Sequence, residues 1–252
     1  MKTIKKIFFA LLLFFTVPAM ATINQQLDSA NVNYKAGKYD KAVTFYENIL
    51  TQGYVAPELY YNLGNAYYKE NNFAYAILNY ERAQKLAPND DDIRFNLKMA
   101  NAHITDKVVP VPTLFFVQWW RDFRNHYSEK TWSVLSITFF SLFFIFLALF
   151  YYFRNAFQKQ LFFSFAIIAI IGTCFTFLLA QQSYSVSHTH NQAIVVSPSV
   201  TVKSSPEEEG TQLFVIHDGT KVKILEKNNV WTEIKLANGN VGWLKNSAIE
   251  PI

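Results

Sequence analysis

The side chains that could perform catalysis or hold a metal are few in this chain and lie far apart. Its 252 residues include five histidines and one cysteine. His188 and His190 form an H-x-H pair that could ligate a metal, but no third ligand is near in the sequence, which favours a polar linker. Cys174 lies in an apolar run, where its thiol is expected to be inert. Glu207–Glu209 are expected to form a solvated loop, and no phosphate loop or nucleophile elbow occurs. We therefore predict no catalytic residues, no metal site and no cofactor.

Aromatic and small residues recur with a period of 34 in the N-terminal region. The matching pairs are Tyr39 with Phe73, Ala42 with Ala76, Tyr46 with Tyr80, and Ala30 with Gly64. Small side chains let antiparallel helices approach closely, and aromatic rings fill the space between neighbouring turns. The second copy, residues 57–90, is the clearer and resembles the tetratricopeptide repeat. That resemblance predicts an all-α repeat domain over residues 22–106, with a weaker first copy at 23–56 and one capping helix at 91–104.

The repeat resemblance also implies where a ligand would bind. Repeats of this kind bind extended peptides along the concave face of their first helices. The pattern places Asn31 and Asn65 at equivalent groove positions, with Lys35 and Lys69 one turn further on. This resembles part of an asparagine-plus-lysine clamp for a peptide carboxylate, but the first clamp lysine is replaced by Leu27, and the third helix offers Phe95 and Met99. The alternative is a solvated helix face.

The C-terminal region, residues 193–252, alternates apolar and polar residues with a period of two between turn signals. Asn238-Gly239 between two alternating runs predicts a hairpin, and about five short strands predict a small all-β barrel. The run Val200–Pro206, the turn at 217–220, Trp231 and Gly242-Trp243-Leu244 resemble a bacterial SH3-like domain. In such a domain Trp231 and Trp243 would fill the core or line a groove that binds cell-wall peptides or protein partners.

Two long apolar runs separate these regions, Trp132–Phe153 and Leu161–Ala180, and neither contains a charged residue. Each has about the 20 residues that a helix needs to cross a bilayer. Buried helices of a soluble protein are the alternative, which the short separation at 154–160 disfavours. That turn carries Arg154 and Lys159 and no acidic residue, so it is predicted to be cytoplasmic. Residues 181–192 are expected to be a linker.

Residues 1–21 have the three parts of a secretory signal peptide. Lys2, Lys5 and Lys6 precede a short apolar run that ends in small residues at Ala19–Ala21. An uncleaved anchor is the alternative, but in either case residue 22 onward starts outside the cytoplasm. The two spans then place both soluble regions on the extracytoplasmic side of the bacterial inner (cytoplasmic) membrane.

The connector, residues 107–131, combines aromatic and basic side chains. Pro110 and Pro112 favour an extended start. Aromatic residues then recur every three or four positions beside Arg121 and Arg124. This pattern predicts a helix in the membrane interface, in contact with lipid. The alternative is a docking site for the repeat domain or for a membrane segment of a partner.

The formal charge of +4 is confined to the segments next to the apolar runs. Residues 22–110 carry nine Lys/Arg and ten Asp/Glu, and residues 191–252 carry six and seven. Neither region therefore has the basic surface that nucleic-acid binding requires, and we predict no nucleic-acid partner.

In this order the regions form a multidomain membrane protein that resembles the BatE-like proteins of the bacterial aerotolerance group. The resemblance implies a non-enzymatic adaptor in a membrane complex that tolerates envelope stress, with partners that include membrane proteins carrying von Willebrand-type domains. A second hypothesis is that the SH3-like domain binds or senses peptidoglycan. A third is an accessory subunit of a transporter, suggested by the two spans.

Overall fold

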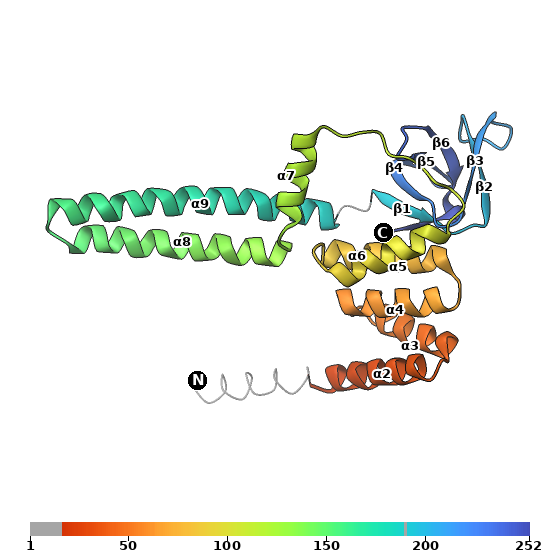
Figure 1. Cartoon of the computed structure of the whole chain (residues 1–252), viewed down its shortest axis with the longest axis horizontal. Coiled ribbons are helices and arrows are strands. Elements are labelled where there is room, and N and C mark those ends of the chain that lie inside the picture. The colour runs from red at the N-terminus through yellow and green to blue at the C-terminus, as the bar shows by residue number, and fades with distance from the viewer. Residues whose placement is uncertain (1–16, 189–190) are drawn as a thin grey trace, which may run out of the picture.

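The computed structural model describes residues 17–188 and 191–252 (Figure 1). Most of the predicted signal peptide, and His190 of the H-x-H pair, lie outside the described residues. The helices are α2 (Val17–Lys35), α3 (Tyr39–Thr51), α4 (Pro57–Lys69), α5 (Phe73–Leu86), α6 (Asp91–His103), α7 (Phe115–Asn125), α8 (Glu129–Tyr152) and α9 (Ala156–His188). The strands are β1 (Gln192–Val195), β2 (Ser199–Lys203), β3 (Gln212–His217), β4 (Lys221–Lys227), β5 (Trp231–Lys235), β6 (Val241–Lys245) and β7 (Ile249–Pro251), with a short 3₁₀ helix, η1 (Asn246–Ala248), before β7.

Helices α2–α6 form the repeat domain, and its core confirms the role of small residues. A Cβ atom added to Gly64 would lie 2.7 Å from the Tyr80 ring, so only glycine allows α4 and α5 to approach this closely. Tyr46 and Tyr80, which are 34 residues apart, are both buried in the core. The predicted all-α repeat fold is therefore confirmed.

The predicted single helix after the second repeat is also present. Helix α5 ends at Leu86, two residues before Pro88, which cannot donate the backbone hydrogen bond that a helix needs. The Asp90 side chain accepts hydrogen bonds from the backbone N–H groups of Asp92 and Ile93 and so caps α6.

Helices α8 and α9 form an antiparallel hairpin, the stalk, that extends away from the rest of the molecule (Figure 1). Both are long and apolar enough to cross a membrane. Their contact is made by small residues of α9, because a Cβ atom added to Gly172 would lie 3.1 Å from the Phe139 ring. Elsewhere large apolar side chains point outward, and Ile137 and Ile168 are 67% and 60% exposed. Such surfaces are unlike the core helices of a soluble protein.

The helices of the stalk are longer than the predicted spans. The Asn155 side chain accepts a hydrogen bond from the Phe157 backbone N–H, so α9 begins inside the predicted turn, 154–160. At the other end α9 continues to His188, where a linker over 181–192 was expected. Within the helix no proline or glycine follows Gly172, so residues 173–188 contain neither of the residue types that most disfavour a helix.

Residues 191–252 form the β-domain, an antiparallel sheet with strand order β3-β2-β6-β5-β4-β1-β7. It has seven strands, whereas the sequence predicted about five, because the short segments β1 and β7 pair with each other. The predicted hairpin at Asn238-Gly239 joins β5 to β6, and Gly239 has a φ of +97°. Ile234, Leu244 and Val202 are fully buried in its core. The predicted all-β SH3-like fold is confirmed.

The β-domain packs against the repeat domain, and the two share one apolar core. Ile194 and Ile252 of the β-domain are buried in the same cluster as Ile77 of α5. At Gly219, φ is +82°, and an added Cβ atom would lie 2.3 Å from Ile104, the residue that follows α6. Figure 1 shows the β-domain lying beside α5 and α6, at the end of the helix stack. It thus covers apolar surface that a third complete repeat would otherwise have to cover.

Candidate functional site

The predicted groove asparagines make the same hydrogen bond in both repeats. The Tyr46 hydroxyl donates to Asn31 Oδ1 and the Tyr80 hydroxyl donates to Asn65 Oδ1, each over 2.7 Å. Burial raises the pKa of both hydroxyls, to about 12 for Tyr46, so they remain protonated donors at neutral pH. Because the amide oxygens are engaged, the NH₂ groups are the parts of Asn31 and Asn65 suited to hold a ligand carbonyl.

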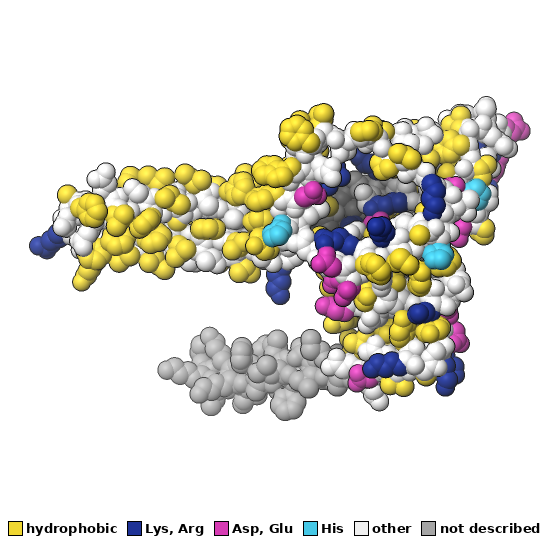
Figure 2. Space-filling view, in the orientation of Figure 1, with side chains coloured by type: hydrophobic (Ala, Val, Ile, Leu, Met, Phe, Trp, Pro, Cys, Tyr) yellow, Lys and Arg dark blue, Asp and Glu magenta, His cyan; other side chains and the backbone are white. Residues whose placement is uncertain are grey.

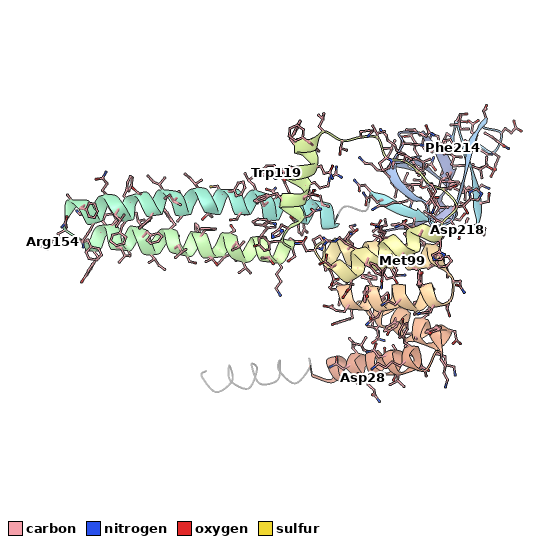
Figure 3. The ribbon with its side chains drawn as sticks, in the orientation of Figure 1. Asp28, Met99, Trp119, Arg154, Phe214 and Asp218 are labelled. Carbon is pink, nitrogen blue, oxygen red and sulfur yellow. The ribbon has the colours of Figure 1, made fainter. Side chains whose placement is uncertain are left out.

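The repeat surface changes character toward α6. Lys35 on α2 and Lys69 on α4 are exposed, as a clamp requires. At the next repeat position Met99 of α6 is exposed (Figure 3). Phe95, one turn earlier on α6, is 63% exposed. Asn96 Nδ2 donates to Asn65 Oδ1 over 2.8 Å and further fixes that amide. The surface therefore offers amide donors near α2 and α4 and apolar side chains on α6. We call this row the repeat groove.

The sequence analysis did not predict the tyrosine partners, although the sequence contains a signal for them. Asn31 and Tyr46 are 15 residues apart, and Asn65 and Tyr80 have the same separation. The same asparagine–tyrosine pair therefore occurs in both copies of the 34-residue repeat. Such a recurrence indicates that the two side chains make the same contact in each repeat, and this contact fixes the orientation of the groove asparagine.

On the β-domain, Trp231 lies beneath two lysines. Lys203 Nζ lies 5.4 Å and Lys245 Nζ 5.8 Å from the centre of the Trp231 ring, within cation–π distance. The Glu208 carboxylate lies 2.6 Å from Lys245 Nζ and 3.8 Å from Lys203 Nζ. The hydrogen bond from Lys245 lowers the pKa of Glu208, so its carboxyl stays ionised. These residues border a depression of about 260 Å³, which we call the tryptophan pocket.

Trp243, the second predicted groove residue, does not line this pocket. It is half-buried on β6, where it pairs with Glu233 of β5 and Lys203 of β2. The sequence could not identify Lys203, Lys245 and Glu208 as neighbours of Trp231, because only the strand register and the path of the 204–211 loop bring them together. The structure places Trp231 at this pocket and Trp243 outside it, and a groove lined by both residues stays a prediction.

Polar contacts hold the repeat domain and the β-domain in a fixed relation. Asp106, just after α6, accepts hydrogen bonds from the His217 backbone N–H over 2.6 Å and from Thr220 Oγ1 over 2.8 Å. Burial raises the pKa of Asp106, but hydrogen bonds from His217 and Thr220 outweigh burial and lower it below its ordinary value. Glu81 of α5 forms an ion pair of 2.6 Å with Lys221 of β4.

The connector adds a backbone contact. Its Val111 N–H donates to the Ala237 carbonyl at the β5–β6 turn over 3.0 Å. The connector therefore runs along the β-domain before it enters α7, where the sequence predicted only an extended link. Within residues 17–188 and 191–252, no three His, Cys, Asp or Glu side chains are placed to hold a metal ion.

Two family models match the chain. Residues 57–90 match the tetratricopeptide repeat, and residues 198–250 match the bacterial SH3 domain. Comparison with curated proteins finds no match. The two matched segments contain the groove residues Asn65 and Lys69 and the pocket residues Lys203, Trp231 and Lys245. The chain thus combines two kinds of domain that bind other molecules with two helices suited to a membrane.

Proposed function

We propose that this protein is a membrane-anchored adaptor that binds partner proteins outside the cytoplasm and does not act as an enzyme. One observation carries this proposal: two binding domains are docked on each other at one end of a stalk whose apolar side chains face outward. In this proposal the repeat groove holds an extended peptide segment of a partner. Asn31 and Asn65 bind its backbone carbonyls, and Phe95 and Met99 contact its apolar side chains.

In the proposed topology the stalk crosses the bacterial inner membrane, and the repeat and β-domains lie on its outer side. The exposed apolar side chains of α8 and α9 support insertion, and a bacterial SH3 domain supports an extracytoplasmic position. Helix α7 would lie in the interface, since Phe115 and Trp119 are 84% and 67% exposed while Trp120 and Phe123 contact Phe175 of α9. Figure 1 shows α7 crossing the end of the stalk, as an interfacial helix would.

The order of domains supports a more specific proposal. It resembles the BatE-like proteins of the aerotolerance group, so we propose that the partners are membrane proteins of one complex, including proteins with von Willebrand-type domains, and that the complex serves envelope-stress tolerance.

Affinity purification of the chain in mild detergent tests the adaptor role. The parental protein should retain other membrane proteins, and the double variant Phe95→Glu/Met99→Glu should lose them. Both side chains are exposed, so the variant should fold. Leu225→Glu/Val230→Glu is the matched control, because it places the same two charges on exposed apolar positions of the β-domain, away from the groove. A parental protein that purifies as a clean monomer would refute the adaptor role.

A second candidate function, binding of peptidoglycan, is favoured by the tryptophan pocket. The Glu208 carboxylate between two lysines shows that the pocket accommodates a carboxylate, and the peptides of the cell wall carry such groups. Co-sedimentation of the detergent-solubilised chain with purified peptidoglycan tests this function. Lys245→Gln should weaken it, and Lys235→Gln, an exposed lysine at the other end of the β5–β6 pair, should not. If the parental chain stays in the supernatant, this function is excluded.

A further inference from the structure

A large cavity lies where the repeat domain, the β-domain and the stalk meet. Its volume is about 1370 Å³. Its walls come from α5, from the junction of α7 with α8, from the last turns of α9 and from β4. Figure 2 shows the hollow between the stalk and the two domains, with Lys and Arg side chains around it. We call it the junction cavity.

The lining of the junction cavity is strongly basic. Six cationic side chains line it, against the side-chain carboxylates of Glu81 and Glu129. Two of the six already donate to the end of the β-domain: Arg82 to the Pro251 carbonyl over 2.6 Å and Lys85 to the Ile252 oxygen over 3.0 Å. Glu81 is already paired with one of the six, Lys221. The cations come from four separate elements and are Arg82, Lys85, Arg121, Arg124, Lys130 and Lys221. The repeat and β-domains have no excess of positive charge, so this concentration is a local property of the cavity.

These cations repel one another at short range. Burial lowers the pKa of Lys85, and the neighbouring charges of Lys221 and Arg82 lower it further. Burial also lowers the pKa of Arg124, with a further contribution from Arg121. Within the described part of the chain, Arg121 and Lys130 have no carboxylate at ion-pair distance. An anion in the cavity would relieve this repulsion and satisfy several donors at once.

The position of the cavity beside the membrane-spanning part of the stalk indicates which kind of anion it would bind. Arg121, Arg124 and Lys130 lie on α7 and at the start of α8, directly before the apolar part of the stalk at Trp132. Cationic side chains just outside a span lie at the depth of lipid headgroups. The volume also exceeds the roughly 300–1,000 Å³ of common small-molecule sites, which favours a phosphate with an attached headgroup over a bare ion.

We propose that the junction cavity binds the phosphate-bearing headgroup of an anionic membrane lipid. Arg121 and Arg124 hold the phosphate from α7, and Lys130 holds it from α8. Arg82, which donates to the Pro251 carbonyl over 2.6 Å, and Lys221, which is paired with Glu81, line the outer part of the site from the repeat and β-domains. Tyr60, whose ring lies 5.9 Å from the Arg82 guanidinium carbon, supports that side chain from behind. The headgroup thereby joins the two domains to the stalk.

Native mass spectrometry of the 252-residue chain in neutral detergent tests the site. The probe is dioctanoyl phosphatidic acid, with dioctanoyl phosphatidylcholine as the lipid whose headgroup has no net charge. The test variant is Arg121→Gln/Lys130→Gln. Arg154→Gln/Lys159→Gln is the matched control, because it removes the same charge at the opposite end of the stalk (Figure 3). Thermal unfolding confirms that each variant folds.

We expect one tightly bound phosphatidic acid per chain and weaker binding of phosphatidylcholine. A cation near an anionic lipid surface contributes roughly a five-fold gain in affinity, so the test variant should bind about 30-fold more weakly. The control variant should bind like the parental chain. An equal loss of lipid affinity in the two variants would overturn the proposed site. It would show that the lipid is attracted by the overall positive charge of the chain and not by the junction cavity.

Two competitors distinguish the source of the anion. If inorganic phosphate displaces the lipid when both are present at the same concentration, the site binds a free ion and the lipid assignment is overturned. A polyglutamate peptide that does so would overturn it in favour of an acidic protein segment. The proposal rests on membrane insertion but not on the adaptor role. The assay uses soluble lipid in detergent, so a failure to bind lipid would not contradict membrane insertion or partner binding. Membrane insertion is measured separately, by extraction of the protein from membranes, and partner binding is measured by affinity purification.

Discussion

Asp106→Ala should undock the β-domain from the repeat domain. The Asp106 carboxylate accepts hydrogen bonds from the His217 backbone N–H and from Thr220 Oγ1, and its other oxygen lies 3.0 Å from His217 Nδ1. Its side chain is only 18% exposed, so alanine would leave these donors with little access to water. One hydrogen bond to a charged group contributes about 1.5–3 kcal/mol, and bonds to one acceptor do not add fully. We expect a loss of about 3 kcal/mol in docking free energy, which raises the undocked population roughly 100-fold.

Hydrogen exchange of the intact chain measures this population. The Val111 amide hydrogen bonds from the connector to the Ala237 carbonyl of the β-domain, so its protection should fall by about the same factor. The His217 amide loses its Asp106 acceptor in this variant and exchanges faster whether or not the domains separate. Asp106→Asn should lose less, because an amide oxygen still accepts two of the bonds. Asp218→Ala is the control, since Asp218 is the exposed neighbour of His217 in the same turn (Figure 3). Parental protection in Asp106→Ala, or an equal loss in Asp218→Ala, would refute the reasoning.

The docking should also depend on pH. The pKa of Asp106 is lowered in the folded chain, so its contribution is fully present above the unfolded pKa, near 3.8. It is lost as the pH falls through the lower, folded value. Protection of the interface should therefore be constant above about pH 5 and decline below about pH 4 in the parental chain, whereas Asp106→Ala should lack this step.

Three further changes test other parts of the structure. Gly219→Ala should undock the β-domain, because the added Cβ atom would lie 2.3 Å from Ile104. Adding Ile104→Ala should partly restore the hydrogen-exchange protection, and a double variant without any restoration would contradict this contact. Gly172→Leu should lower the midpoint of thermal unfolding in detergent by several degrees, because it forces α9 away from Phe139; an unchanged midpoint would show that the helices do not pack there. Trp119→Phe should remove part of the tryptophan fluorescence that brominated lipids quench, and undiminished quenching would argue against α7 lying in the interface.

The sequence was sufficient to predict the kinds of domain and their order, because those depend on local patterns. Gly64 and Tyr80 follow Ala30 and Tyr46 by 34 residues each, and this recurrence of small and aromatic residues indicates closely packed helices. The charge-free run Trp132–Phe153 requires an apolar environment. Asn238-Gly239 specifies a hairpin through the backbone geometry that glycine permits. Each of these signals is contained within a few tens of residues.

The contacts between regions could not be predicted in the same way. Asp106 and His217 are 111 residues apart, and nothing in the sequence near Asp106 indicates that it reaches the β-domain. Lys203 and Lys245 meet over Trp231 only because β2 and β5 both pair with β6. The tryptophan pocket and the junction cavity both depend on contacts between distant segments. The sequence therefore indicated Trp231 for the first, and for the second only Arg121 and Arg124 as part of an interfacial helix.

The shared core of the two domains has a consequence for how the chain is made. The repeat domain is synthesised first, yet its core includes Ile194 and Ile252, which follow both helices of the stalk in sequence. In the proposed topology those residues reach the outer side only after the second span has been inserted. The repeat domain then completes its fold only in chains whose hairpin is correctly threaded. In that topology, a chain that fails at the second span would present a repeat domain whose core lacks Ile194 and Ile252.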